Sequence, residues 1–170
     1  LIIRGMIRGR NRILRDLDPR KIGIQDIDRM EDGSEFELYL QRLLSALGNK
    51  DLYKTTSSRD FGADLVFTDR EGARVVIQAK RYAVQHPVGL GAVQEIYTSM
   101  RYYAADKSVV ITSGRYTESC KTLAAVNGVK LLDRNDLEDM IDLFKSKRRE
   151  EVMDVIESRA EVVVSKWSKK

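Results

Sequence analysis

The order of its hydrophobic segments constrains the fold of this 170-residue chain more than any other feature. The stretch 52–80 holds three short segments of strand character in succession, and from residue 91 onward helical and strand-like segments alternate. Closely spaced strands form antiparallel hairpins, whereas a helix between two strands usually connects parallel ones. The sequence therefore predicts an α/β domain with a central mixed β-sheet flanked by helices, in the order αβββαβαβα.

The helix that opens this order is the most clearly marked element. Asp32, Gly33 and Ser34 supply capping residues, and acidic side chains follow in the first turn, where the helix dipole favours them. Apolar residues then recur at helical spacing, at Phe36, Leu40, Leu43, Leu44 and Leu47. Gly48 is the expected end. The pattern predicts a helix over 33–47 with one buried face.

The remaining elements are predicted from local pattern in the same way. Further helices are expected at 91–103, 117–127 and 135–144, and strands at 52–56, 63–68, 74–80, 108–112 and 129–132. Residues 1–17 are predicted to form a basic helix, 21–32 a connecting stretch, and 147–166 a final helix. We divide the chain into an N-terminal helical extension (1–29), a core (30–145) and a C-terminal helix (146–170).

Composition excludes several classes of protein. With 42% hydrophobic and 33% charged residues, the chain has the make-up of a globular domain rather than a disordered one. Cys120 and His86 are the only residues of their types, so an internal disulfide, a zinc finger and chemistry that needs several histidines are excluded. A reducing, cytoplasmic location is expected. The chain has no apolar run long enough to cross a bilayer.

The positive charge is concentrated at the two ends of the chain. Residues 1–24 carry a net charge of +5 and residues 145–170 a net charge of +3, whereas the whole chain has only +4. Basic ends of this kind can hold the phosphates of a nucleic acid, or they can be solvated helix faces. The charge pattern alone does not choose between these two interpretations.

Four polar residues form the candidate catalytic group: Glu37, Asp64, Gln78 and Lys80. Gln78 and Lys80 are two apart on one predicted strand and so share a face, and Asp64 begins the strand expected to pair with it. Carboxylate and amide oxygens suit a hard divalent cation, and a nearby lysine can orient a water or stabilise phosphate charge. The alternative, which spacing alone favours, is a strand with an ordinary solvated face. A nucleotide-binding protein is disfavoured because no GxxxxGK[ST] or GxGxxG motif follows a strand.

Separated motifs, in the right order, resemble those of the Mrr-like restriction endonucleases of the PD-(D/E)xK superfamily. The resemblance covers about 30–143. It rests on Asp32-Gly33-Ser34-Glu35-Phe36-Glu37, on Asp60-Phe61-Gly62-Ala63-Asp64-Leu65-Val66, and on Val75-Val76-Ile77-Gln78-Ala79-Lys80-Arg81-Tyr82. Val88-Gly89, Ala92-Val93-Gln94-Glu95, Val109-Val110-Ile111-Thr112, Leu131-Leu132-Asp133-Arg134 and Leu137 continue it.

The resemblance implies a role for each candidate residue. Asp64 matches the metal-binding aspartate, Lys80 the catalytic lysine, and Glu37 the acidic residue of the first helix, for which Glu35 is a weaker substitute. Gln78 stands where most of the superfamily has a carboxylate, as in the D-QxK variant. The implied activity is Mg²⁺- or Mn²⁺-dependent hydrolysis of DNA to 5′-phosphate ends, in restriction or defence. A homodimer or higher homo-oligomer is expected, because cutting both strands of a duplex needs two active sites.

Two other functions remain open on the sequence. A structure-selective nuclease, similar to the Holliday-junction resolvases, is permitted by the helix glutamate. A DNA-binding or assembly module that no longer cuts is the other possibility. Residues around the group are candidates for a supporting or DNA-contacting role: Arg59, Arg81, Tyr82, Gln94 and Glu95. By contrast, Tyr97, Tyr102 and Tyr103 are expected to pack in the core or against helices rather than to stack on bases.

Overall fold

A five-stranded mixed sheet forms the centre of the protein, as seen in a computed structural model that describes residues 16–56 and 61–163. The strands are β1 (Lys50–Lys54), β2 (Leu65–Thr68), β3 (Arg74–Lys80), β4 (Lys107–Thr112) and β5 (Lys130–Leu132), and they lie side by side in that order. The first three are antiparallel, whereas β3, β4 and β5 are parallel. This confirms the predicted mixed sheet.

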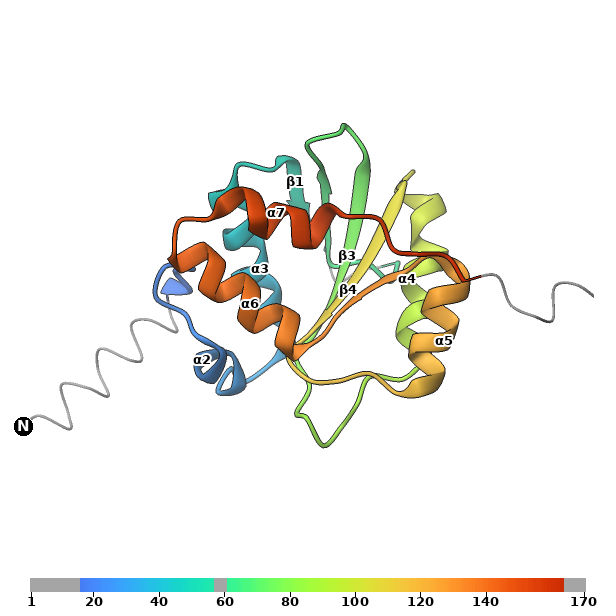
Figure 1. Cartoon of the computed structure of the whole chain (residues 1–170), viewed down its shortest axis with the longest axis horizontal. Helices are drawn as coiled ribbons and strands as arrows, with labels where there is room; N and C mark the ends of the chain where they lie inside the picture. Colours follow the sequence, from blue (N-terminus) through green and yellow to red (C-terminus); the bar gives the residue numbers. More distant parts are fainter. Residues whose placement is uncertain (1–15, 57–60, 164–170) are drawn as a thin grey trace, which may run out of the picture.

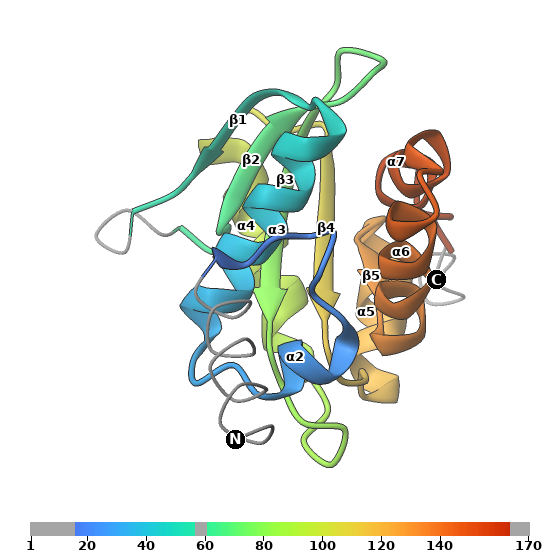
Figure 2. The same cartoon turned by 90° about the vertical axis from the view of Figure 1, so that its left-hand side faces the viewer.

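Helices cover both faces of the sheet (Figure 1). The helices are α2 (Ile24–Asp28), α3 (Gly33–Leu47), α4 (Gly91–Tyr102), α5 (Glu118–Asn127), α6 (Arg134–Lys145) and α7 (Arg149–Glu157). One hydrophobic cluster joins α3, α6 and α7 to one face, and a second joins α4 and α5 to the other. In Figure 2, α3 crosses in front of the sheet and α4 lies behind it.

The alternation of side chains along β3 decides which residues meet which layer of helices. Val75, Ile77 and Ala79 belong to the cluster packed under α3, whereas Val76 belongs to the cluster packed under α4. Gln78 and Lys80, at even positions like Val76, therefore lie on the α4 face of the sheet. This is the face division predicted from the sequence.

Capping signals explain why α3 and α5 match their predicted limits. The Asp32 carboxylate accepts hydrogen bonds from the backbone N–H groups of Ser34 and Glu35, and Gly48 ends α3 in a left-handed conformation. Thr117 and Gly128 do the same for α5. These local contacts satisfy backbone groups that the helix itself leaves without partners.

Two predictions about the periphery need correction. The connecting stretch 21–32 contains the short helix α2, which the sequence analysis did not expect. The predicted final helix, 147–166, ends early, since α7 stops at Glu157 and the chain continues without regular structure to Val163, whose N–H donates to the carbonyl of Ala125. The predicted basic helix 1–17 falls almost wholly outside the described residues.

An ion-pair network fixes α7 to the β2–β3 turn. Arg70 in this turn donates hydrogen bonds to Glu150, Asp154 and Glu157 of α7, at 2.6–2.7 Å. Beneath it, the buried Lys107 Nζ lies 2.6 Å from Asp69 Oδ2 and 2.8 Å from the Glu157 carbonyl oxygen.

No helix of the described part of the chain is long and apolar enough to cross a membrane.

Candidate active site

Asp64 lies between two strands, just before β2 begins. Its backbone N–H donates to the Ile77 carbonyl oxygen at 2.8 Å, and its own carbonyl oxygen accepts from the Thr55 N–H at 2.9 Å. The side chain is only 8% exposed, and its Oδ2 accepts a hydrogen bond of 2.7 Å from the backbone N–H of Ala79. The carboxylate is thus fixed against β3 at Ala79, the residue between Gln78 and Lys80.

Gln78 and Lys80 lie on the same face of β3, next to Asp64. Leu65 pairs with Ile77 in the antiparallel register, so the residues that adjoin this pair, Asp64 and Gln78, are neighbours across the strands. The Gln78 side chain is 4% exposed, whereas Lys80 is partly exposed at the end of the strand. Three of the four sequence-predicted residues are therefore neighbours at one end of the sheet.

Glu95 of α4 links the two polar side chains of β3. Its Oε2 accepts a hydrogen bond of 2.8 Å from Gln78 Nε2 and lies 3.9 Å from Lys80 Nζ. The approach of α4 that allows this contact depends on Gly62, because a Cβ atom there would lie 2.5 Å from the Glu95 carbonyl oxygen. Glu95, expected only as a possible supporting residue, is in direct contact with the candidate group.

The orientation of Gln78 leaves one buried acceptor available. Because Nε2 donates to Glu95, the carbonyl oxygen Oε1 is the atom on the other side of the amide, and it has no hydrogen-bond partner among the described residues. A buried carbonyl without a donor costs about 1–3 kcal/mol. A cation would satisfy this oxygen, so the donor set of Asp64 and Gln78 fits a hard metal ion.

Glu37 is positioned separately from the other three residues. It lies on α3, which packs against the opposite face of the sheet, and its Oε2 forms an ion pair of 2.9 Å with Lys54 Nζ. Lys54 pairs with Leu65, directly after Asp64, so Glu37 is at the same end of the sheet. Among the described residues, no three Asp, Glu, His or Cys side chains gather closely enough to hold a metal ion.

Among the other candidates that the structure describes, Tyr82 contacts the group through its backbone, since its N–H donates to the Lys80 carbonyl oxygen at 3.1 Å. Gln94 is exposed on α4, and Arg81 and Tyr82 line a small cleft after β3 that also includes Asp28 and Arg134. The Arg81 Nε is buried without a hydrogen-bond partner in the described part of the chain. Glu35, the proposed substitute for Glu37, accepts from the Glu31 N–H instead. Arg59 lies outside the described residues.

Sequence reasoning missed two residues that position the group. Lys54 holds Glu37, and Thr55 holds the segment before β2, with its Oγ1 2.7 Å from the Ala63 carbonyl oxygen and 3.2 Å from that of Asp64. Their only sequence signal was their place at the end of the strand before the Ser-rich loop. Of the three tyrosines expected to pack in the core or against helices, Tyr103 is buried, and Tyr102 packs against Phe61 and Tyr103 although it is about half exposed, as is Tyr97.

Comparison with known structures shows the same fold in restriction endonucleases. The chain is similar to the DNA modification-dependent restriction endonuclease AspBHI, with a TM-score of 0.52 and 19% identity over 78% of this chain and 38% of that one. It is also similar to the MspJI restriction endonuclease in complex with a 27-mer oligonucleotide, with a TM-score of 0.56 and 18% identity over 86% and 37%. The chain thus spans less than two-fifths of either enzyme. No curated protein matches it.

A family model also matches most of the chain. The model of the Mrr catalytic domain, described as a restriction endonuclease, matches residues 27–141. The match includes all four sequence-predicted catalytic positions and ends within α6. The chain therefore belongs to the Mrr-like restriction endonuclease family.

Proposed function

We propose that this chain is a Mg²⁺- or Mn²⁺-dependent endonuclease domain that hydrolyses phosphodiester bonds in DNA. Membership of a restriction endonuclease family supports the reaction class. The single observation that carries the metal dependence is the buried Gln78 Oε1, which lacks a hydrogen-bond donor among the described residues and adjoins Asp64. Together they offer a carboxylate and a neutral oxygen, the ligand types that both cations accept.

Asp64 and Gln78 would hold the cation directly, and Glu37 would supply the further negative charge that the neutral amide does not. Glu37 is at this end of the sheet in an ion pair with Lys54, so its contribution would require that ion pair to rearrange. When bound, the cation would lower the pKa of a water molecule and neutralise charge on the phosphate. The ligand set supports one metal ion more readily than two, since one of its members is uncharged.

Lys80 and Glu95 would complete the reaction centre. Lys80 would orient the attacking water or stabilise the charge that develops on the phosphate oxygens. Glu95 is a positioning residue in this scheme. By accepting from Gln78 Nε2 it directs Oε1 toward the cation, and by attracting Lys80 it restricts that side chain. The chain's own residues thus bind, orient and neutralise, with 5′-phosphate ends as the expected product.

DNA is the proposed substrate, and the similar MspJI structure contains an oligonucleotide. Each chain offers one such centre, so cutting both strands of a duplex would require a homodimer or higher homo-oligomer. We propose a restriction or defence role in the cytoplasm. A structure-selective nuclease and a module that binds DNA without cutting it are the alternatives that the test must separate.

The test is cleavage of supercoiled plasmid by the purified protein, with Mg²⁺, with Mn²⁺ and with excess chelator. The wild-type protein is expected to nick and linearise the plasmid only with metal, and Asp64→Asn and Lys80→Ala to lose this activity by at least about a hundredfold. Lys121→Ala, an exposed lysine paired with Glu118 on α5, is the matched control and should cleave normally.

The outcomes distinguish the three functions. Equal nicking by wild type and Lys80→Ala in Mg²⁺ would contradict the enzyme assignment and favour a module that only binds DNA. Cleavage of junction and flap substrates with no activity on linear duplex would favour the structure-selective nuclease. Methylated and unmethylated plasmids in parallel report whether modification controls cleavage.

A further inference from the structure

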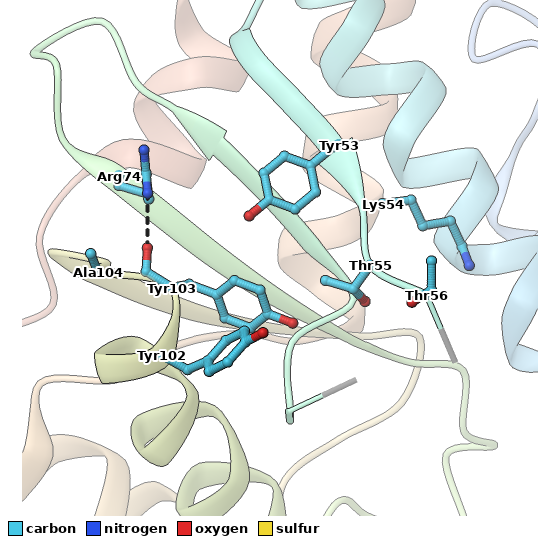
Figure 3. Close-up of a pocket in the computed structure, with 8 residues that line it drawn as sticks. All are labelled: Tyr53, Lys54, Thr55, Thr56, Arg74, Tyr102, Tyr103 and Ala104. Carbon is cyan, nitrogen blue, oxygen red and sulfur yellow. Dashed lines mark hydrogen bonds between the residues drawn. The ribbon is translucent and has the colours of Figure 1, made fainter. Parts of the chain in front are cut away.

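A cleft of about 440 Å³ opens beside the candidate active site and has no role in the chemistry proposed above. Its lining consists of Tyr53, Lys54, Thr55, Thr56, Arg74, Tyr102, Tyr103 and Ala104, which come from the β1 end of the sheet, the start of β3 and the end of α4 (Figure 3). Clefts that hold small ligands or parts of larger ones have about 300–1,000 Å³. The size is sufficient for a nucleobase.

The cleft exists because α4 covers only part of its face of the sheet. The helix packs over β3 and β4, whereas β1 is the edge strand, two strands away from β3. Tyr53 pairs with Val66, a residue of the cluster under α4, so Tyr53 points to that same face. The part of the face over β1 is thus left open, and mainly aromatic and polar side chains line it.

Aromatic rings stand on opposite sides of the cleft. In Figure 3, Tyr53 extends over it from β1, while Tyr102 and Tyr103 enter from the end of α4. Tyr53 is 45% exposed and Tyr102 57% exposed, so both rings are open to solvent. The ring of Tyr102 is braced by Phe61 at 4.1 Å and by Tyr103 at 4.9 Å between centroids. Braced, exposed rings are suited to stack on a flat apolar ligand.

Polar groups in the lining favour a nucleotide over an uncharged aromatic ligand. Arg74 is exposed, and its Nη1 donates to the Tyr103 carbonyl oxygen at 3.1 Å, which fixes the guanidinium at the edge of the cleft. The Thr55 hydroxyl lies at the opposite end. A fixed guanidinium is well suited to a phosphate oxygen, and exposed aromatic rings with nearby cations are typical of surfaces that hold single-stranded nucleic acid.

Thr55 places the cleft next to the proposed cation site. Thr55 is bonded to Asp64 through its N–H at 2.9 Å, and Asp64 in turn is the neighbour of Gln78 on β3. Adjacent strands are about 4.8 Å apart, and residues two apart on a strand are about 6.6 Å apart. A nucleotide in the cleft would therefore be close, along the DNA strand, to a phosphodiester group bound at Asp64.

We propose, on the basis of the function proposed above, that this cleft holds one unstacked nucleobase of the DNA strand being cut, between Tyr53 and Tyr102. The base must leave its stack to enter, and this costs least where it is unpaired. The enzyme then binds DNA with an unpaired nucleotide more tightly than the matching duplex.

The experiment measures binding rather than cleavage, with Ca²⁺ in place of Mg²⁺. The probes are two oligonucleotide duplexes that carry a single 2-aminopurine, in one as an unpaired bulge and in the other fully paired. Affinity is measured by anisotropy, and stacking by the quenching of 2-aminopurine fluorescence. Wild type is expected to bind the bulged probe more tightly and to quench it, whereas Tyr53→Leu and Tyr102→Leu should each bind it about tenfold more weakly.

Tyr97→Leu is the matched control, because Tyr97 is an exposed tyrosine of α4 that does not line the cleft. It should bind both probes as wild type does, and thermal melting of all variants should be unchanged. Equal affinity of wild type for the two probes, or wild-type quenching by both cleft variants, would overturn the proposal. Plasmid cleavage is scored separately, so a nuclease without this base preference and a base-binding cleft without cleavage give different results.

Discussion

Gly62 shows how the absence of a single Cβ atom allows α4, with Glu95, to approach the strands of the site. Its φ of 89° lies in the left-handed region, and a Cβ there would be 2.5 Å from the Glu95 carbonyl oxygen. Gly72 in the β2–β3 turn has a similar φ of 84° but nothing within 4 Å of the Cβ position. Substitution of Gly72 therefore measures only the cost of the left-handed backbone conformation, whereas substitution of Gly62 adds the cost of the clash with Glu95.

Gly62→Ala is expected to lose most DNA cleavage, because α4 must retreat and carry Glu95 away from Gln78. Gly72→Ala should lower the free energy of unfolding by about 1–2 kcal/mol, the cost of the left-handed conformation, and should cleave normally. Chemical denaturation and plasmid cleavage measure both effects. Equal cleavage by the two variants would show that the approach of Gly62 to α4 does not matter for the site.

Glu95 offers a second test, of position rather than chemistry. Glu95→Ala should raise the Mg²⁺ concentration for half-maximal cleavage about tenfold, because Gln78 loses the acceptor that orients its amide. Glu95→Gln keeps an acceptor oxygen and should recover part of the affinity. Glu118→Ala, an exposed glutamate on α5, is the control. An unchanged metal requirement in Glu95→Ala would exclude the positioning role.

At the scale of elements, the prediction succeeded where local signals agree with the tertiary contacts. Caps and an apolar stripe predict α3, and alternation along β3 predicts that Gln78 and Lys80 share a face. The end of α7 could not be predicted, because the carbonyl oxygens of Glu157 and Ser158 there accept from Lys107 and Lys130, which are far away in the chain. For the same reason the sequence could not predict that Lys54 holds Glu37, nor that Gly62 brings Glu95 to Gln78.

The Asp69–Lys107 pair is expected to hold the β2–β3 turn, β4 and α7 together. Burial on its own would raise the pKa of Asp69, but the hydrogen bond and charge of Lys107, together with the backbone N–H groups of Ala73 and Glu71, outweigh burial and hold this pKa below its ordinary 3.8. Asp69→Asn should reduce the free energy of unfolding at pH 7 by about 3 kcal/mol, because a buried ammonium group loses its main partner.

The pH dependence of this difference follows from the direction of the shift. A depressed pKa stabilises the fold above the ordinary value of 3.8 and loses that contribution as the pH falls through the folded-state value. The gap between wild type and Asp69→Asn should therefore narrow as the pH is lowered below about 4. Denaturation curves at several pH values measure it. A gap that stays constant down to acid pH would contradict the ion pair as its cause.

At the scale of the whole molecule, the family could be identified from the sequence, whereas the open face of the sheet could not be predicted. Motifs in order identify the family, because they occupy strand ends and turns whose residue types are constrained. The cleft beside the site was not predicted, since it depends on how far α4 extends over the sheet. The exposure of Tyr102 at the end of α4 depends on the same tertiary arrangement.

Because each chain has one proposed active site, the rate of plasmid linearisation should depend on protein concentration. If two copies must act together to cut both strands, the rate of plasmid linearisation should rise with about the square of protein concentration, whereas nicking should rise linearly. Sedimentation at the same concentrations reports the oligomeric state. Linearisation that is first order in a monomeric protein would contradict the homo-oligomer.

The most direct test is calorimetric measurement of Mn²⁺ binding to the DNA-free protein, because the proposed metal-dependent cleavage requires Asp64 and the Gln78 carbonyl oxygen to share a cation. We predict that Asp64→Asn and Gln78→Leu each weaken binding at least tenfold, and that Gln78→Glu, which replaces the amide by a carboxylate, tightens it. Wild-type affinity in both Asp64→Asn and Gln78→Leu would contradict the account.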